Sequence, residues 1–118
     1  CLIALTITLA PQEPLVSYLL NKPGVRLIGT PVNALRVPTI SFIHDKKSPA
    51  EIVAALHAAK IACRSGHMYA RRLMDAVYPD SADAHKREAE WGVVRVSLAH
   101  YNTMEEVERC IAALEAFL

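Results

Sequence analysis

The spacing of hydrophobic and polar residues predicts several short strands. The clearest is at residues 37–43, where the run VPTISFI is rich in β-branched residues. Shorter strands are predicted at 25–28, at 61–64 and at 93–98. In the last of these, Arg95 is the one charged residue of an apolar run. A buried charge costs free energy unless it finds a partner, so Arg95 is the first candidate for a functional side chain.

Helices are predicted from capping signals and from apolar residues three or four positions apart. Ser48 and Thr103 each precede a glutamate by three residues, Glu51 and Glu106, and this spacing predicts a capping box at a helix start. Residues 1–10 mix β-branched and helix-forming residues, so their state stays open. The predicted helices occupy residues 11–21, 49–59, 67–77 and 104–118.

The order of these elements predicts a fold class. Helix, strand, strand, helix, strand, helix, strand, helix is typical of an α+β domain with a small sheet and helices on one side. Residues 29–36 are expected to form a loop, and the polar residues 78–90, which lack a clear period, a surface excursion. The 118 residues are enough for one domain with its own core.

Composition and charge exclude several classes of function. The 13 basic residues nearly balance the 12 acidic ones and form no long run, which argues against a nucleic-acid partner. The apolar first ten residues are too short to span a bilayer, so no membrane partner is expected. The hydrophobic share of 53% suits either a self-contained core or an apolar surface that meets another domain.

The cysteines and histidines predict neither a disulfide framework nor a metal site. Cys1, Cys63 and Cys110 are far apart and odd in number, and they form no CxxC motif. The histidines are scattered and show no metal-ligand spacing. A reducing, cytoplasmic setting is therefore expected.

Two stretches of sequence point to a known family. Residues 61–70 read IACRSGHMYA, and residues 94–103 read VRVSLAHYNT before the last capped helix. Together they resemble the C-terminal region of class V enzymes that depend on pyridoxal 5′-phosphate (PLP). The nearest likeness is to the cysteine desulfurase and selenocysteine lyase branch, where R-x-G-H-x-C-A precedes R-x-S-x-x-x-Y-N-T and a closing helix. The resemblance covers roughly residues 23–118 and implies the small, mostly antiparallel C-terminal domain of a fold-type I enzyme.

The resemblance also implies what surrounds such a domain. A large domain of the same chain would hold PLP through a lysine, within a homodimer, and the enzyme would act on an amino acid as a transferase or a lyase. No lysine here lies in a matching context, and the chain does not begin with Met. The chain is thus expected to be a fragment that lacks catalytic residues, binds no PLP stably and is inactive alone. The alternative is a non-catalytic domain for binding a partner or for dimerisation.

Four residues are the candidates for substrate binding. By the resemblance, Arg95 holds the substrate carboxylate, for which a planar guanidinium is suited. Arg64 and His67 match family positions near the substrate, although a surface salt bridge and a helix-start role are the respective structural alternatives. Tyr69 either lines the pocket as a hydrogen-bonding residue or packs. His100, beside the second motif, is a weaker candidate.

Tyr69 also marks a departure from the family pattern. In the desulfurases, the matching position carries the cysteine that receives sulfur, and tyrosine cannot form a persulfide. Desulfurisation by the usual route is therefore doubtful, although a desulfurase that uses Cys63 instead stays open. Relatives that lack this cysteine include epimerases, C–S lyases and aminotransferases.

Overall fold

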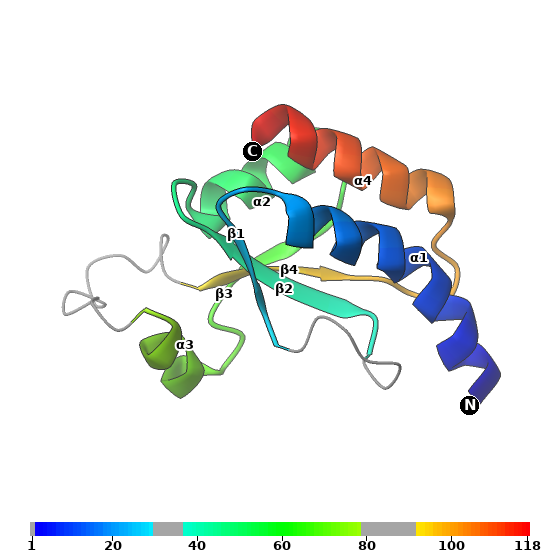
Figure 1. Cartoon of the computed structure of the whole chain (residues 1–118), viewed down its shortest axis with the longest axis horizontal. Coiled ribbons are helices and arrows are strands. Elements are labelled where there is room, and N and C mark those ends of the chain that lie inside the picture. Colours follow the sequence, from blue (N-terminus) through cyan, green and yellow to red (C-terminus); the bar gives the residue numbers. More distant parts are fainter. Residues whose placement is uncertain (1, 30–36, 79–91) are drawn as a thin grey trace.

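The computed structural model describes residues 2–29, 37–78 and 92–118, with side chains from Gln12 onward. Its strands form one antiparallel sheet in the order β1-β2-β4-β3 (Figure 1). The predicted α+β fold with a small antiparallel sheet is therefore confirmed. The elements are α1 (Leu2–Asn21), β1 (Val25–Ile28), β2 (Thr39–His44), α2 (Pro49–Ala58), β3 (Arg64–Gly66), α3 (Arg71–Val77), β4 (Val93–Ser97) and α4 (Met104–Phe117).

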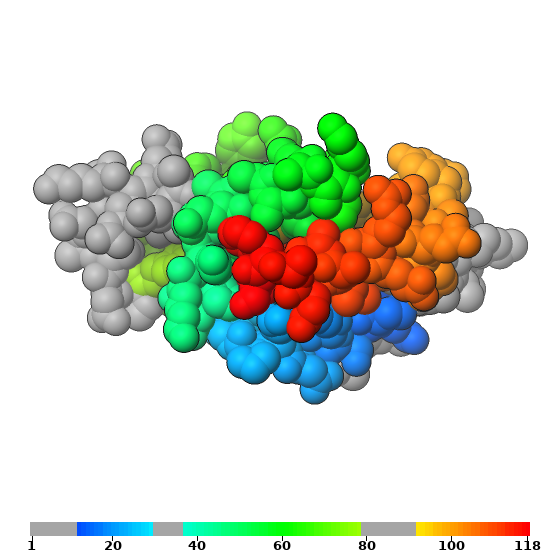
Figure 2. Space-filling view, turned by 90° about the horizontal axis from the view of Figure 1, so that it is seen from above, coloured from blue at the N-terminus to red at the C-terminus, as the bar shows by residue number. Residues whose placement is uncertain are grey.

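Three helices cover one face of the sheet. Helix α4 packs against both α1 and α2, and Figure 2 shows it lying between them. Lys22 of the α1–β1 turn and Tyr18 of α1 both bind the Glu115 carboxylate of α4, at 2.8 Å and 2.7 Å. The core beneath is built from alternate strand residues, because successive side chains of a strand point to opposite faces. The strand residues buried here are Ile40, Phe42, Val94 and Val96.

The short helix α3 lies outside this layer. Met74 packs with Ile43 and Val93, which point away from the three long helices. Arg26 of β1 donates to the Val77 carbonyl oxygen at 2.8 Å, and so ties the end of α3 to the sheet. The expected layer of helices on one side therefore consists of α1, α2 and α4, while α3 covers one end of the opposite face.

Two predicted helix starts were wrong. Helix α1 begins at Leu2 instead of Pro11, so Pro11 and Pro14 lie inside it. Proline removes a backbone donor but has a helical φ, so helix-forming neighbours can continue through it at a cost. Helix α3 begins at Arg71 instead of near His67, because residues 68 and 69 have left-handed backbone conformations. In this helix Met74 is buried, whereas Leu73 is 49% exposed.

The third strand is also displaced from its predicted position. Ladder pairing covers Arg64–Gly66, whereas the prediction was 61–64. Ile61 donates its amide to the Leu56 carbonyl, and its side chain packs against the core together with that of Cys63. Their apolar character indicates burial, and burial alone does not distinguish a strand from a packed loop. Residues 30–36 of the predicted loop and residues 79–90 of the predicted surface excursion lie outside the described residues.

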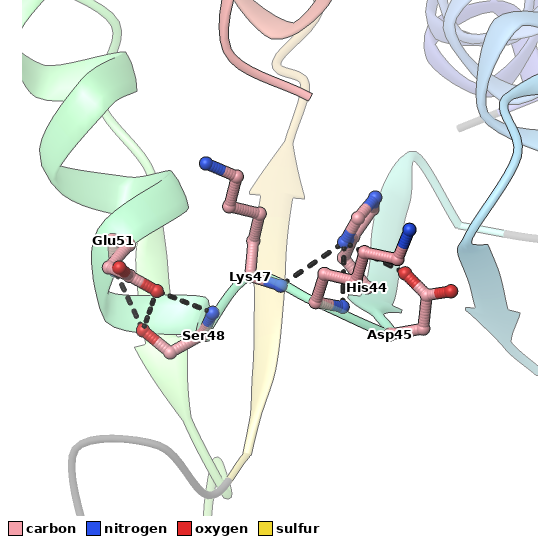
Figure 3. Close-up of polar contacts among 6 residues, drawn as sticks. His44, Asp45, Lys47, Ser48 and Glu51 are labelled. Atoms are coloured by element: carbon pink, nitrogen blue, oxygen red, sulfur yellow. Dashed lines mark hydrogen bonds and ion pairs between the residues drawn. The ribbon is translucent and has the colours of Figure 1, made fainter.

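The connection from β2 to α2 is fixed by a buried histidine and a capping box. The His44 side chain is 5% exposed, and its Nδ1 accepts from the Lys46 and Lys47 amides at 3.1 Å and 3.2 Å (Figure 3). The two backbone amides converge on one ring nitrogen, so the His44 ring holds the connection in its tight course. Ser48 and Glu51 then form the predicted capping box.

The second capping box starts α4. The Thr103 hydroxyl accepts from the Glu106 amide at 3.3 Å, and the Glu106 carboxylate accepts from the Thr103 amide at 3.0 Å. Asn102 joins this box, since its amide group donates to Glu106 at 2.9 Å and accepts from the Ala99 amide at 2.7 Å. The capping box predicted at Thr103 is confirmed, and Asn102 extends it.

The two capping boxes predict a loss of stability in acid. Hydrogen bonds from Ser48 lower the pKa of Glu51, and hydrogen bonds from Asn102 and Thr103 lower the pKa of Glu106. A carboxyl group with a lowered folded-state pKa stabilises the fold above its unfolded pKa of about 4.3, and the gain is lost as the pH falls through the folded value. Urea unfolding of the 118-residue chain between about pH 6 and about pH 3 measures this loss.

Matched variants separate the capping carboxylates from the others. Glu51→Gln and Glu106→Gln keep an oxygen acceptor but do not titrate, so each is expected to flatten the acid limb of the stability curve. The control is Glu108→Gln, which removes an exposed carboxylate of α4 outside the box. Equal flattening by all three variants would show that general charge repulsion, and not capping, sets the acid limb.

Candidate functional site

Two of the predicted site residues lie directly opposite each other. Arg64 of β3 and Arg95 of β4 are Cα partners in the antiparallel ladder. Val94 and Val96 face the helical layer, so Arg95 between them points to the opposite face, and Arg64 shares that face. Side chains in such a position have Cβ atoms about 4.5–5.5 Å apart. The fold thus places the two arginine side chains on neighbouring strands, on the face that α1, α2 and α4 leave open.

The surroundings of this arginine pair are polar. Ser41 of β2 is the partner of Arg95 on its other side, and on the same face Thr39 and Ser97 place their hydroxyl oxygens 3.3 Å apart. Among the described residues, no carboxylate lies within ion-pair distance of Arg64 or Arg95. The structural alternative of a surface salt bridge for Arg64 therefore has no support in the described part of the chain. Two unneutralised guanidiniums with a nearby hydroxyl make a surface suited to an anion.

His67 and Tyr69 follow the arginine pair in a tight turn. The Tyr69 amide donates to His67 Nδ1 at 3.0 Å, and the Ala70 amide donates to the His67 carbonyl at 2.7 Å. Met68 and Tyr69 have φ of 50° and 63°, a left-handed conformation that costs a non-glycine residue about 1–2 kcal/mol. His67 thus bonds a backbone amide, but α3 begins at Arg71, so the helix-start position predicted as its structural alternative is wrong.

Tyr69 projects from the tip of this turn. Its side chain is fully exposed, and its ring meets the His67 ring edge-on at 6.2 Å. The packing alternative for Tyr69 is therefore wrong for the described residues. A strained turn that presents an exposed side chain is common at functional sites, and lining a substrate pocket stays a prediction for this residue.

Two glycines hold β3 against β4 at the same end of the sheet. Gly66 and Gly92 have φ of +132° and +134°, which other residues rarely adopt. A Cβ on Gly92 would lie 2.6 Å from the Gly66 Cα, so the two backbones touch there. Tyr78 donates to the Gly92 carbonyl at 2.8 Å and fixes the same point. Gly92 and Ser41 could not be recognised as site residues from the sequence, because both matter only through strand pairing.

A cavity of about 340 Å³ lies away from these residues. It opens beside the first turns of α4 on the helical side, between α1, the segment from Lys60 to Ala62 and the segment after β4. None of the four predicted substrate-binding residues lines it, and neither does His100. The cavity and the arginine pair are therefore separate features.

The described cysteines, Cys63 and Cys110, lie in environments that disfavour a nucleophilic thiolate. Burial raises the pKa of the half-buried Cys63 thiol, and burial with the nearby Cys63 raises that of Cys110 to about 11. Reactive cysteines need the thiolate form and exposure.

Within the described ranges, no three His, Cys, Asp or Glu side chains converge as metal ligands, and no helix is long and apolar enough to cross a membrane.

The sequence is similar to those of known proteins. The chain is 41% identical over 110 residues to the aminotransferase-like protein FGM3 of Gibberella zeae, which covers 91% of this chain and 25% of that protein. It is 38% identical over 92 residues to a cysteine desulfurase of Synechococcus elongatus, covering 78% of this chain and 13% of the relative. The chain thus spans a quarter or less of the length of these relatives.

The fold recurs in a solved structure, and a family model matches the sequence. A NifS-like protein from Rickettsia africae superposes with a TM-score of 0.72 and 20% identity, over 96% of this chain and 28% of the solved one. The model of the family described as aminotransferase class-V matches residues 8–110. The chain therefore belongs to the class-V aminotransferase family.

Proposed function

We propose that the chain is the C-terminal small domain of a longer PLP-dependent enzyme, in which it binds and orients an amino-acid substrate. The observation that carries this proposal is Arg95, a charged residue of an interior strand that has no carboxylate partner among the described residues. A bidentate guanidinium pairs naturally with an α-carboxylate. The resemblance of residues 94–103 to the family motif supports the same role.

The described lysines do not fit a resident cofactor. Lys22 pairs with Glu115, Lys47 lies 4.5 Å above the Phe117 ring, and Lys60 lines the cavity on the helical side. None of these lies on β3 or β4, where the arginine pair is. The lysine that anchors PLP would thus belong to another part of the protein. The contribution of this chain to the reaction would be to bind, orient and shield the substrate.

Within that limit, each residue has a distinct task. Arg95 would fix the carboxylate and so set the direction of the bonds at Cα. Positioning of this kind contributes on the order of 7 kcal/mol in ideal cases. His67 would stabilise the strained turn by accepting the hydrogen bond from the Tyr69 amide that is present in this structure. Tyr69 would close the side-chain end of the site.

The usual desulfurase chemistry is disfavoured. Tyr69 stands where the desulfurases carry their cysteine, and a phenol cannot accept sulfur as a persulfide. Cys63 and Cys110 are buried to different degrees with raised thiol pKa values, so neither is a ready substitute nucleophile. We therefore favour a transferase or lyase reaction of an amino acid without a protein persulfide.

The test is the intact mass and the visible spectrum of the native gene product. We expect a chain longer than 118 residues that turns yellow with PLP, and whose visible band changes when an amino-acid substrate is added. The Cys63→Ala variant should respond in the same way. A native chain of this length that stays colourless would overturn the proposal. Light scattering would then examine the alternative, a binding or dimerisation domain.

A further inference from the structure

The cavity of about 340 Å³ beside α4 has an apolar floor and a charged mouth. Its volume is at the lower end of the range in which proteins hold small molecules, about 300–1,000 Å³. The apolar residues of its lining come from four segments that are far apart in the sequence and include Leu15, Ile61, Leu98, Val107 and Cys110. Leu15, Val107 and Cys110 are at most 4% exposed, so the floor is part of the core. The apolar part of a ligand would therefore meet a preformed surface there.

Lys60 gives the mouth of this cavity a positive charge. Lys60 is exposed, and no carboxylate of the described residues lies within ion-pair distance of it. The other two charged residues of the lining, Glu106 and Arg109, are three positions apart on α4, a spacing at which opposite charges attract. Glu106 is also held by the capping box at Thr103. Lys60 is thus the cation of the lining that an anionic ligand can neutralise.

The backbone of Lys60 has a conformation that disfavours lysine. The Lys60 amide donates to the His57 carbonyl oxygen and the Ile61 amide to the Leu56 carbonyl oxygen, both at 2.9 Å, which is the Schellman arrangement at a helix end. Lys60 has a φ of 63°, and glycine is the usual residue at this position because it has no Cβ. Lysine therefore lowers the stability of the fold relative to glycine. Strained residues are found mainly where a side chain has a function, and this one lies at a cavity.

We propose that this cavity binds a small carboxylate with an apolar tail. The tail lies against Ile61, Leu98 and Val107, and the carboxylate pairs with the Lys60 ammonium group at the mouth. One cation without a counter-charge suits a head group with a single negative charge. This second site lies on the helical side of the sheet, away from the arginine pair, and its assignment does not rest on the proposed function.

The experiment titrates the 118-residue chain with hexanoate and with 1-hexanol and follows its amide NMR signals. We expect both probes to shift the signals of residues 60–62, 98–102 and 106–110, and hexanoate to bind about fivefold more tightly, which is the effect of one exposed ion pair. Lys60→Gly should remove this difference by weakening hexanoate, with 1-hexanol changed by less than about twofold. Because glycine suits the left-handed position, the same variant should unfold at a higher urea concentration, so misfolding cannot explain the lost affinity.

Two control variants and the contrary outcomes complete the test. Lys60→Arg keeps the charge and should keep most of the preference for hexanoate, whereas Lys46→Gln removes an exposed lysine outside the cavity lining and should change neither affinity. Equal affinity for the two probes, or a preference for hexanoate that survives in Lys60→Gly, would overturn the inference. Shifts at Arg64 and Arg95 in place of the cavity residues would overturn it as well, because the carboxylate would then bind the arginine pair.

Discussion

Alanine in place of Arg95 is expected to lower kcat/KM of the complete enzyme for its amino-acid substrate by about 100-fold or more, with little change in PLP binding. A hydrogen-bonded ion pair contributes about 1.5–3 kcal/mol, and each 1.4 kcal/mol corresponds to a factor of ten. Loss of orientation at Cα adds to the loss of affinity, so kcat should fall as well as KM rise. Steady-state kinetics and titration of the visible PLP band measure the two effects separately.

The same variant should not unfold the domain. Removing Arg95 relieves the repulsion with Arg64 across the ladder, so the free energy of unfolding should change by less than about 1 kcal/mol. Arg95→Lys keeps the charge but loses the planar pair of donors, and should recover only part of the activity. Arg109→Ala, an exposed arginine of α4 on the helical side, is the control. Full activity in Arg95→Ala would refute the assignment.

The parts of the fold that follow from local rules were predictable. Both capping boxes lie where the spacing of Ser48 and Glu51, and of Thr103 and Glu106, places them. A cap depends only on residues within one turn, so a sequence contains the whole signal. Strands β2 and β4 were found to within two residues because their β-branched runs face a core.

The elements that were misplaced depend on conformations that sequence rules treat as rare. Met68 and Tyr69 adopt left-handed φ values that are expected mainly of glycine or asparagine, so the start of α3 was set too early. Ile61 and Cys63 are apolar because they pack against the core as a loop. Hydrophobicity alone does not separate that case from a buried strand.

The candidate site was predictable residue by residue but not as an arrangement. Arg95 was recognisable as a charge in an apolar strand, and Arg64 as a match to a family position. Their pairing, and the presence of Ser41 in the same row, follow from strand register. Register is set by contacts far apart in the sequence, and a shift of one residue would have put Arg95 into the core.

Alanine in place of Gly92 is expected to lower the free energy of unfolding of the 118-residue chain by about 4 kcal/mol. Two costs combine at this position. A φ of +134° strains any residue with a Cβ, and the new Cβ would lie 2.6 Å from the Gly66 Cα and the Gly66 carbonyl oxygen. Backbone atoms cannot rotate away as a flexible side chain does, so β3 must separate from β4. Urea unfolding measures the loss.

Gly66→Ala is the matched control, because it shares the strain but not the clash. Its φ is +132°, and a Cβ there would meet nothing within 4 Å. Its expected cost is therefore the backbone strain alone, about 2 kcal/mol. Gly92→Ala should also lose amide protection in β3, and with it the register that sets Arg64 opposite Arg95. Equal costs for the two variants would mean that the strands do not touch at these glycines, and that another feature holds the arginine pair together.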